Sequence, residues 1–227
     1  MNKRTFTLVE LLVVIGIIAI LTGILLPAVN GAMKKADSAK AKASITTFVN
    51  AIKQYESTYG KLPIPASYTE GNALSCSDAS NSDSSRADED CQYSWLIKIL
   101  QNETLTSAQA SNYGALNAFN PRKIKFLDVV GNQPGVYQDP WDNDFQVIFD
   151  KNYDDKIEVS DGIPGLVGKT DSSNVLYYYS LIVWSAGPDL KYQDGKQDSD
   201  RKNKRNKDNI YSVPTQWSKA EGHVLGK

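Results

Sequence analysis

The chain has 227 residues, 25 basic and 26 acidic side chains, and a formal net charge of −1. This charge balance excludes a global field that would select nucleic acid or an acidic substrate as partner. Roughly 200 residues remain beyond an apolar N-terminal segment, which is enough for one domain with its own core. The only histidine, His223, lies in a polar tail. The sequence has no Gly-rich phosphate loop, zinc-spaced Cys/His set or Gly-x-Ser-x-Gly elbow, so we predict no catalytic residue and no enzyme.

The first element is an apolar run. Among the nineteen residues Leu11–Val29, only Thr22 has a side chain with a hydrogen-bonding group. A helix needs about 20 such residues to cross a hydrocarbon core about 30 Å thick, so we predict a membrane helix over residues 6–29. Glu10 lies near its start. A carboxylate at the centre of a membrane helix costs about 2.5–3.5 kcal/mol, so Glu10 either has a partner or reaches the lipid headgroups.

The residues around Glu10 carry a family resemblance. The stretch Lys3–Leu12, which reads KRTFTLVELL, resembles the N-terminus of type IV pilins and of type II secretion pseudopilins. In that family a membrane-embedded peptidase removes a basic leader just before the Phe, and the new terminal amine is methylated. The resemblance implies a leader of residues 1–5, a cut between Thr5 and Phe6, and a methylated Phe6. Thr5 stands where the family nearly always has Gly. The resemblance also implies that Glu10 pairs with the Phe6 amine of a neighbouring subunit.

Beyond the apolar run the pattern becomes amphipathic. Apolar residues recur at helical spacing as far as Tyr59, between lysines and small polar residues. We predict one long helix from about Phe6 to Tyr59, ended by Gly60. Its first half would be membrane anchor and filament core, and its second half, residues 30–59, would pack on a sheet. A helical hairpin is the alternative, and the strongest turn signal in the run is the Asn-Gly dipeptide at residue 30.

The rest of the chain predicts short helices followed by strands. A Ser-, Asp- and Asn-rich segment, residues 64–90, is expected to be a surface loop that contributes little to the core. Helices are expected at Tyr93–Gln101 and Thr106–Phe119. Strands are expected at Lys123–Val130, Phe145–Phe149, Lys156–Val159 and Val175–Trp184. This order indicates an α+β, type IV pilin-like fold with the long helix packed on a C-terminal antiparallel sheet, and one globular domain over residues 30–227.

The two cysteines, Cys76 and Cys91, flank a polar stretch. The resemblance places the C-terminal part of the chain outside the cytoplasm, where disulfides persist, so we expect the two to be bonded. With fourteen residues between them, the loop-closure model gives roughly 3 kcal/mol of stabilisation. Two free thiols are the alternative.

Two further segments resemble the major pseudopilins of type II secretion. Residues Asp139–Phe145, DPWDNDF, resemble their Asp-Pro-Trp-Gly-Asn-Pro-Tyr motif, with Asp in place of the Gly and of the second Pro. Residues Ser185–Asp189, followed by Asp208–Ile210, resemble their calcium loop. By position, this resemblance implies a calcium site formed by Ala186, Asp189, Asn206, Asp208 and Asn209. Carboxylates and backbone carbonyls are ligands that Ca²⁺ takes, although Asn206 and Asn209 stand where the family often has Asp. A solvated loop is the alternative.

A second acidic segment, Asp150–Ile157, places polar oxygens at alternate positions, as in the first part of an EF-hand-type loop. The predicted ligands of this second calcium site are Asp150, Asn152 and Asp154. The segment lacks the Gly and the final Glu of a complete loop. A tight hairpin turn between the flanking strands is the alternative.

These features predict a structural subunit of a type II secretion pseudopilus that drives protein export across the outer membrane. By resemblance, it would be a single-pass protein of the inner membrane with its globular domain in the periplasm, surrounded by lipid before assembly. Its partners would be prepilin peptidase, an inner-membrane assembly platform, other pseudopilins and copies of itself in a helical filament. The alternative is a type IV pilin or minor pilin in adhesion, motility or DNA uptake. The basic run at residues 201–207 is flanked by aspartates, so we expect a solvated loop and no nucleic acid partner.

Overall fold

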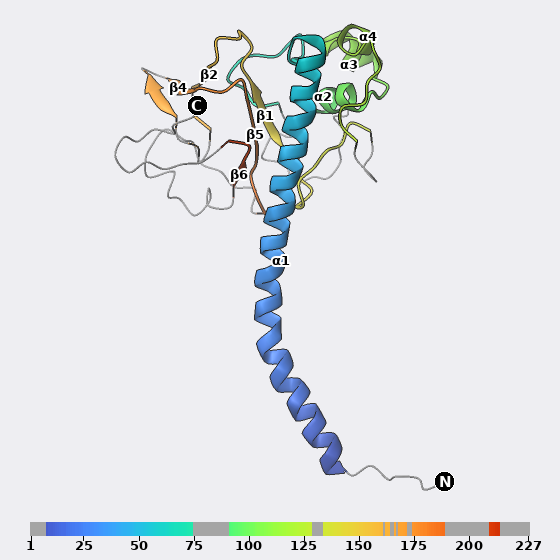
Figure 1. Cartoon of the computed structure of the whole chain (residues 1–227), viewed down its shortest axis with the longest axis vertical. Helices are drawn as coiled ribbons and strands as arrows, with labels where there is room; N and C mark the ends of the chain where they lie inside the picture. Colours follow the sequence, from blue (N-terminus) through green and yellow to red (C-terminus); the bar gives the residue numbers. More distant parts are fainter. Residues whose placement is uncertain are drawn as a thin grey trace. The chain divides into compact units, whose positions relative to one another are not determined.

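A computed structural model describes residues 8–74, 91–128, 134–160, 162–163, 166, 168–171, 174–188 and 209–213, without the side chains of 24–28 and 170–171. The elements in chain order are α1 (Leu8–Tyr59), α2 (Gln92–Gln101), α3 (Ser107–Tyr113), α4 (Leu116–Phe119), β1 (Gln146–Phe149), β2 (Ile157–Val159), β3 (Lys169–Asp171), β4 (Asn174–Tyr177), β5 (Leu181–Ser185) and β6 (Ile210–Tyr211) (Figure 1). The chain divides into two compact units, Met1–Ala39 and Lys40–Lys227. The α+β class predicted from the sequence is confirmed.

The long predicted helix is confirmed as α1, which spans 52 residues. Its backbone is helical at Asn30 and Gly31, so the helical hairpin is wrong. The helix ends where predicted, because Gly60 adopts a left-handed φ of 69° and its N–H donates to the Glu56 carbonyl at 2.7 Å. Glycine adopts this conformation without the steric cost of a Cβ, which makes it the usual residue just after a helix.

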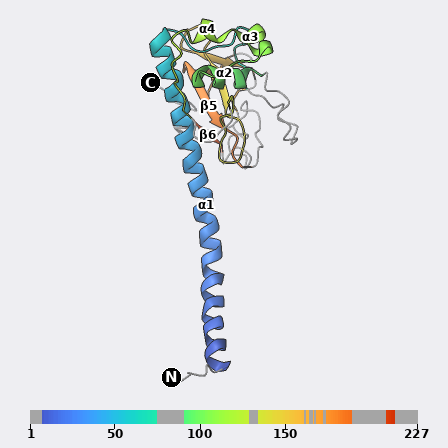
Figure 2. The ribbon, with the colours of Figure 1, turned by 90° about the vertical axis from the view of Figure 1, so that its right-hand side faces the viewer.

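Within the second unit, α1 contributes one apolar face to the main core. Residues at a spacing of three and four are fully buried there, among them Ile45, Phe48, Ile52 and Tyr55. They pack in one cluster with residues of α2, β1 and β5. Figure 2 shows α2 and β5 beside the same part of the helix. The prediction that this half of the helix packs on a sheet is therefore confirmed.

The strands form two three-stranded antiparallel sheets, with the orders β1-β5-β6 and β2-β4-β3. Successive side chains of a strand point to opposite faces of its sheet. In β1 and β5, Phe149 and Val183 join the cluster with α1, whereas Ile148 and Ile182 join a second cluster with residues of β2 and β4. β1 and β5 are thus buried on both faces, between the helices and the second sheet.

Two predicted elements are interrupted in the structure. The helix predicted over Thr106–Phe119 is instead α3 and α4, separated at Gly114, where φ is 119°. A residue at this φ cannot continue an α-helix, and a Cβ here would collide with the Phe119 ring, so the position requires glycine. The strand predicted over Val175–Trp184 is β4 and β5, which belong to different sheets.

Two other predictions are wrong. Residues 123–128, expected to begin a strand, are irregular. The N–H groups of Phe126 and Leu127 donate to the Leu100 carbonyl at 2.8 and 3.0 Å, at the C-terminal end of α2. The segment from residue 64 was expected to contribute little to the core, yet Tyr68 and Leu74 are 2% and 1% exposed. The sequence predicts neither β3 nor β6.

Candidate functional site

The N-terminal unit presents an apolar surface. The large apolar side chains from Leu8 to Leu21 are 47–78% exposed. Exposed apolar patches of this kind mark surfaces that bind a protein or a membrane. Glu10 is exposed in the first turn of α1. Thr5 and Phe6 lie outside the described residues, so the predicted cut, the methylated amine and its pairing with Glu10 stay predictions.

In the second unit, the structure brings together the two motifs that sequence reasoning treated separately. The Ser185 hydroxyl donates to Asp139 Oδ2 at 2.6 Å, and both residues are buried. Asp139 Oδ1 accepts from the backbone N–H groups of Trp141 and Asn143, each at 2.9 Å. Ser185 Oγ also accepts from the Gly187 N–H at 3.1 Å. One carboxylate and one hydroxyl therefore connect the Asp-Pro-Trp turn to the turn after β5.

The Asp139 carboxylate is electrostatically unusual. Burial raises its pKa above the ordinary value, although the hydrogen bonds from Ser185, Asn143 and Trp141 act to lower it. Removal of a carboxylate from water disfavours its charged form, and hydrogen bonds to it favour that form. Desolvation outweighs the hydrogen bonds here. The charge at this junction is therefore less favourable in the folded chain than in water.

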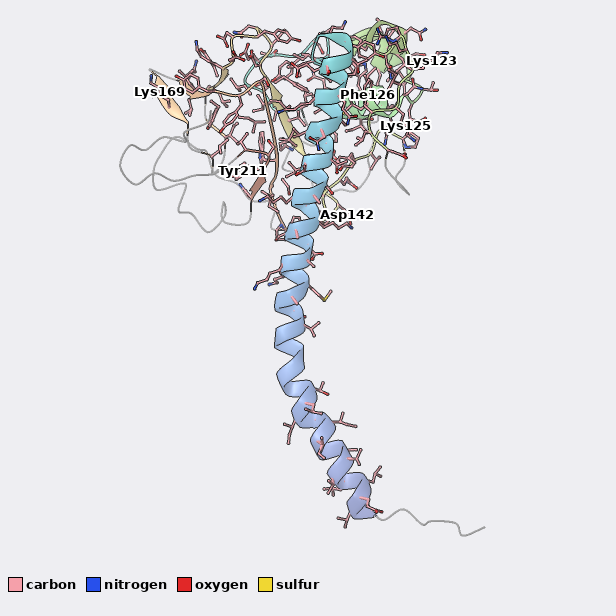
Figure 3. All side chains as sticks on the ribbon, in the orientation of Figure 1. Lys123, Lys125, Phe126, Asp142, Lys169 and Tyr211 are labelled. Carbon is pink, nitrogen blue, oxygen red and sulfur yellow. The ribbon has the colours of Figure 1, made fainter. Side chains whose placement is uncertain are left out.

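The geometry of the Asp-Pro-Trp turn also accounts for one difference from the motif that it resembles. Asp142, which is labelled in Figure 3, stands where the motif has Gly. It adopts a left-handed φ of 63°. Its N–H donates to the Asp139 carbonyl at 3.1 Å, and the Asp139 N–H donates to the Asn143 carbonyl at 2.8 Å. Aspartate is one of the few residues other than glycine that enters this region of φ and ψ. The turn geometry thus requires either glycine or a tolerant substitute.

The predicted calcium loop is only partly described. Its ends meet because β5 pairs with β6, with Ser185 opposite Ile210. Ala186 follows β5 directly and Asn209 precedes β6, whereas Asp189, Asn206 and Asp208 lie outside the described residues. Among the residues that the structure describes, no group of three or more His, Cys, Asp and Glu could hold a metal ion. Calcium at this loop stays a prediction.

The polar side chains of the second acidic segment, residues 150–157, accept hydrogen bonds from N–H groups of the same segment. Asp150 accepts from the N–H groups of Tyr153 and Asp155 at 2.8 and 2.9 Å. The Asn152 side chain accepts from the Asp154 N–H at 3.0 Å. The Asp154 carboxylate accepts in turn from the Lys156 N–H, also at 3.0 Å. Such local bonds are the reason that Asp and Asn recur in turns. The loop joins β1 to β2, which lie in different sheets, so the hairpin alternative is wrong. The second calcium site stays a prediction.

Cys91 lies immediately before α2. Its Sγ accepts from the Ser94 N–H at 3.2 Å, which caps the first turn of the helix. Cys91 is disulfide-bonded. The other cysteine of the sequence, Cys76, lies outside the described residues.

A long N-terminal helix followed by antiparallel sheets is the fold class of type IV pilin-like proteins. Residues 1–26 match the model of the prokaryotic N-terminal methylation motif. This motif supports a membrane-anchored, type IV pilin-like protein, of a class that is processed by prepilin peptidase and assembles with other pilin subunits. Comparison with curated proteins and with solved structures found no significant match.

Within the described part of the chain, none of the helices combines the length and the apolar character needed to cross a membrane.

Proposed function

We propose that this chain is a structural subunit of a type II secretion pseudopilus. The observation that carries the proposal is the buried hydrogen bond between Asp139 and Ser185. It joins the two segments that resemble the major pseudopilins, so their motifs act as one structural unit. The methylation motif at residues 1–26 and the exposed apolar side chains of α1 also support a subunit that assembles through its N-terminal helix.

In this proposal, the chain is held in the inner membrane with its globular domain in the periplasm. Prepilin peptidase cuts between Thr5 and Phe6 and methylates Phe6, and an assembly platform then extracts the subunit into the filament. Glu10 pairs with the Phe6 amine of a neighbouring subunit, which compensates the charge of both groups in lipid. The filament grows and drives folded proteins through an outer-membrane channel.

We further propose that calcium binds between β5 and β6. Ala186 and Asn209 lie at the two ends of a loop that the β5–β6 pairing closes, and Asp189 would supply the main carboxylate. Chelation with EGTA should then lower the melting temperature and filament yield of the wild type, and should leave the Asp189→Ala variant unaffected. Equal melting temperatures of the wild type with and without calcium would refute the calcium site.

The function is tested by deleting the gene in its host and complementing it with the wild type, with Glu10→Gln or with Glu10→Asp. We expect deletion and Glu10→Gln to abolish secretion into the medium, and Glu10→Asp, which keeps the charge, to restore part of it. Mass spectrometry of the membrane-extracted chain should show a methylated Phe6 terminus. Normal secretion after deletion, together with loss of surface pili, adhesion, motility or DNA uptake, would instead identify a type IV pilin or minor pilin.

A further inference from the structure

A cluster of cations lies between the end of α1 and the segment after α4. It consists of the exposed side chains Lys61, Arg122, Lys123 and Lys125, which we name the basic surface. Lys61 Nζ lies 5.2 Å from the centre of the Phe119 ring, and Arg122 Cζ lies 5.9 Å from that of Tyr59. Lys125 pairs with Asp128 at 2.9 Å, which compensates one of the four charges.

A buried amide holds this surface in place. Asn120 is fully buried, and its Oδ1 accepts from the Tyr59 hydroxyl at 2.6 Å and from the Ile124 N–H at 3.0 Å. Its Nδ2 lies within hydrogen-bonding distance of the carbonyls of Ile99 and Ile124, at 3.2 and 2.8 Å. One side chain therefore fastens the segment that carries the cations to both α1 and α2. The segment of Arg122, Lys123 and Lys125 is thus anchored to both helices.

Lys123 itself adopts a conformation that does not favour lysine. Its φ is 54°, in the left-handed region that glycine and asparagine enter more readily. The side chain is exposed, so burial in the core does not account for its presence. The turn that begins at Asn120 sets this backbone, because the Lys123 N–H donates to the Asn120 carbonyl at 3.1 Å. The exposed lysine at this position adds its positive charge to the basic surface.

The same unit carries a complementary acidic surface around β2. It consists of the exposed carboxylates Asp154, Asp155 and Glu158. The neighbouring Glu70 has a raised pKa, because of burial first and then of the negative charges of Asp150, Asp154 and Glu158. Lys156 lies 3.7 Å from Asp154 and offsets part of this charge. Figure 1 shows β2 on one side of α1, and Figure 3 shows Lys123 and Lys125 on the other side.

We propose that the basic surface of one copy of this chain binds the acidic surface of the next copy in the filament. The proposal rests on the proposed function as a filament subunit. Opposite charges on opposite sides of one molecule make a head-to-tail contact, and contacts of this kind extend into a filament when the rotation does not close a ring. Exposed ion pairs add little affinity singly, but they orient the partners and set their register.

The test uses the full-length chain and measures the filaments sheared from cells that produce it. One variant reverses the basic surface (Arg122→Glu with Lys123→Glu), another reverses the acidic surface (Asp154→Lys with Glu158→Lys), and a third combines all four changes. Each one-sided reversal should lower the filament yield about tenfold, and the combined variant should restore most of it. Lys125→Gln, at a position whose charge Asp128 already compensates, is the control and should assemble nearly normally.

A second variant separates binding from folding. Lys123→Asn removes the charge but suits the left-handed backbone, so it should keep or raise the melting temperature of the detergent-solubilised chain while lowering filament yield. Normal assembly of both one-sided reversals, or a combined variant that assembles no better than they do, would overturn the contact. An effect of the basic reversal alone would also overturn it, in favour of another anionic partner. In each of these cases a wild type that still forms filaments leaves the proposed function standing, whereas a wild type without filaments refutes both.

Discussion

The junction between Asp139 and Ser185 allows a quantitative prediction for the variant Ser185→Ala. Ser185 is fully buried, and its hydroxyl serves two partners, the Asp139 carboxylate and the Gly187 N–H. A hydrogen bond to a charged group contributes about 1.5–3 kcal/mol, and a buried donor left without an acceptor costs about 1–3 kcal/mol. Partial relaxation of the turn reduces the sum, so we expect a loss of about 3 kcal/mol in the free energy of unfolding.

For a unit of this size, about 1 kcal/mol corresponds to a shift of about 2–4 °C in melting temperature. Ser185→Ala should therefore melt about 6–12 °C below the wild type in a calorimetric scan of the full chain in detergent. The control is Asp139→Asn, whose Oδ1 retains the two backbone hydrogen bonds and whose Nδ2 can donate to the Ser185 hydroxyl. It removes a charge that burial disfavours, so it should lose less stability than Ser185→Ala.

The raised pKa of Asp139 also predicts the sign of a pH dependence. Because the folded-state pKa lies above the ordinary value of 3.8, the folded chain binds more protons than the unfolded chain between the two values. This contribution to stability is present below the unfolded pKa and is lost as pH rises through the folded pKa. The stability of the wild type relative to Asp139→Asn should thus fall from about pH 4 towards pH 7. A relative stability that rises over this range, or a Ser185→Ala variant that melts within about 2 °C of the wild type, would refute the reasoning.

Three further predictions concern stability. Asp142→Gly should raise the free energy of unfolding by up to about 1 kcal/mol in thermal melts, because glycine adopts the left-handed conformation without strain; a less stable variant would show that the Asp142 side chain contributes more than its strain costs. Burial raises the pKa of Tyr68 to about 12, so alkaline titration should destabilise the wild type as pH rises from about 10 to 12. Tyr68→Phe should show a smaller loss, with the remainder due to Tyr55, Tyr93 and Tyr137, whose pKa values burial also raises. At neutral pH it should be less stable by about 1–2 kcal/mol, since Tyr68 hydrogen-bonds both backbone groups of Phe149. Reduction with dithiothreitol should lower stability by roughly 3 kcal/mol if Cys91 bonds Cys76, and an unchanged melting temperature would contradict this contribution.

Some elements of this chain are specified locally and others are not. The helix through Tyr59 is predictable from the sequence because its hydrogen bonds and its apolar spacing are local, and because Gly60 provides a recognisable end. The break at Gly114 is not predictable in this way, since it is accompanied by the approach of the Phe119 ring and by a hydrogen bond from the Trp95 indole to the Gly114 carbonyl at 2.8 Å. These contacts involve residues that are distant in the sequence, so the residue spacing within the segment cannot predict them.

The strands show the same limit. The apolar run Val175–Trp184 indicated β-structure, but it contains one strand of each sheet. Both halves are buried, so the composition does not reveal where the chain leaves one sheet for the other. The irregular segment 123–128 was mistaken for a strand because its residues are apolar at intervals, whereas its backbone groups instead serve the end of α2.

The apolar N-terminal run, the methylation motif, the long helix and the α+β class could be predicted from residue types and their local spacing. The burial of β1 and β5 on both faces, the contact of Asp139 with Ser185, and the place of Lys61 beside the cations after α4 became evident only in the folded chain. Asp139 and Ser185 are 46 positions apart in the chain. A contact at that distance depends on how the strands pair and pack, which local sequence patterns do not specify.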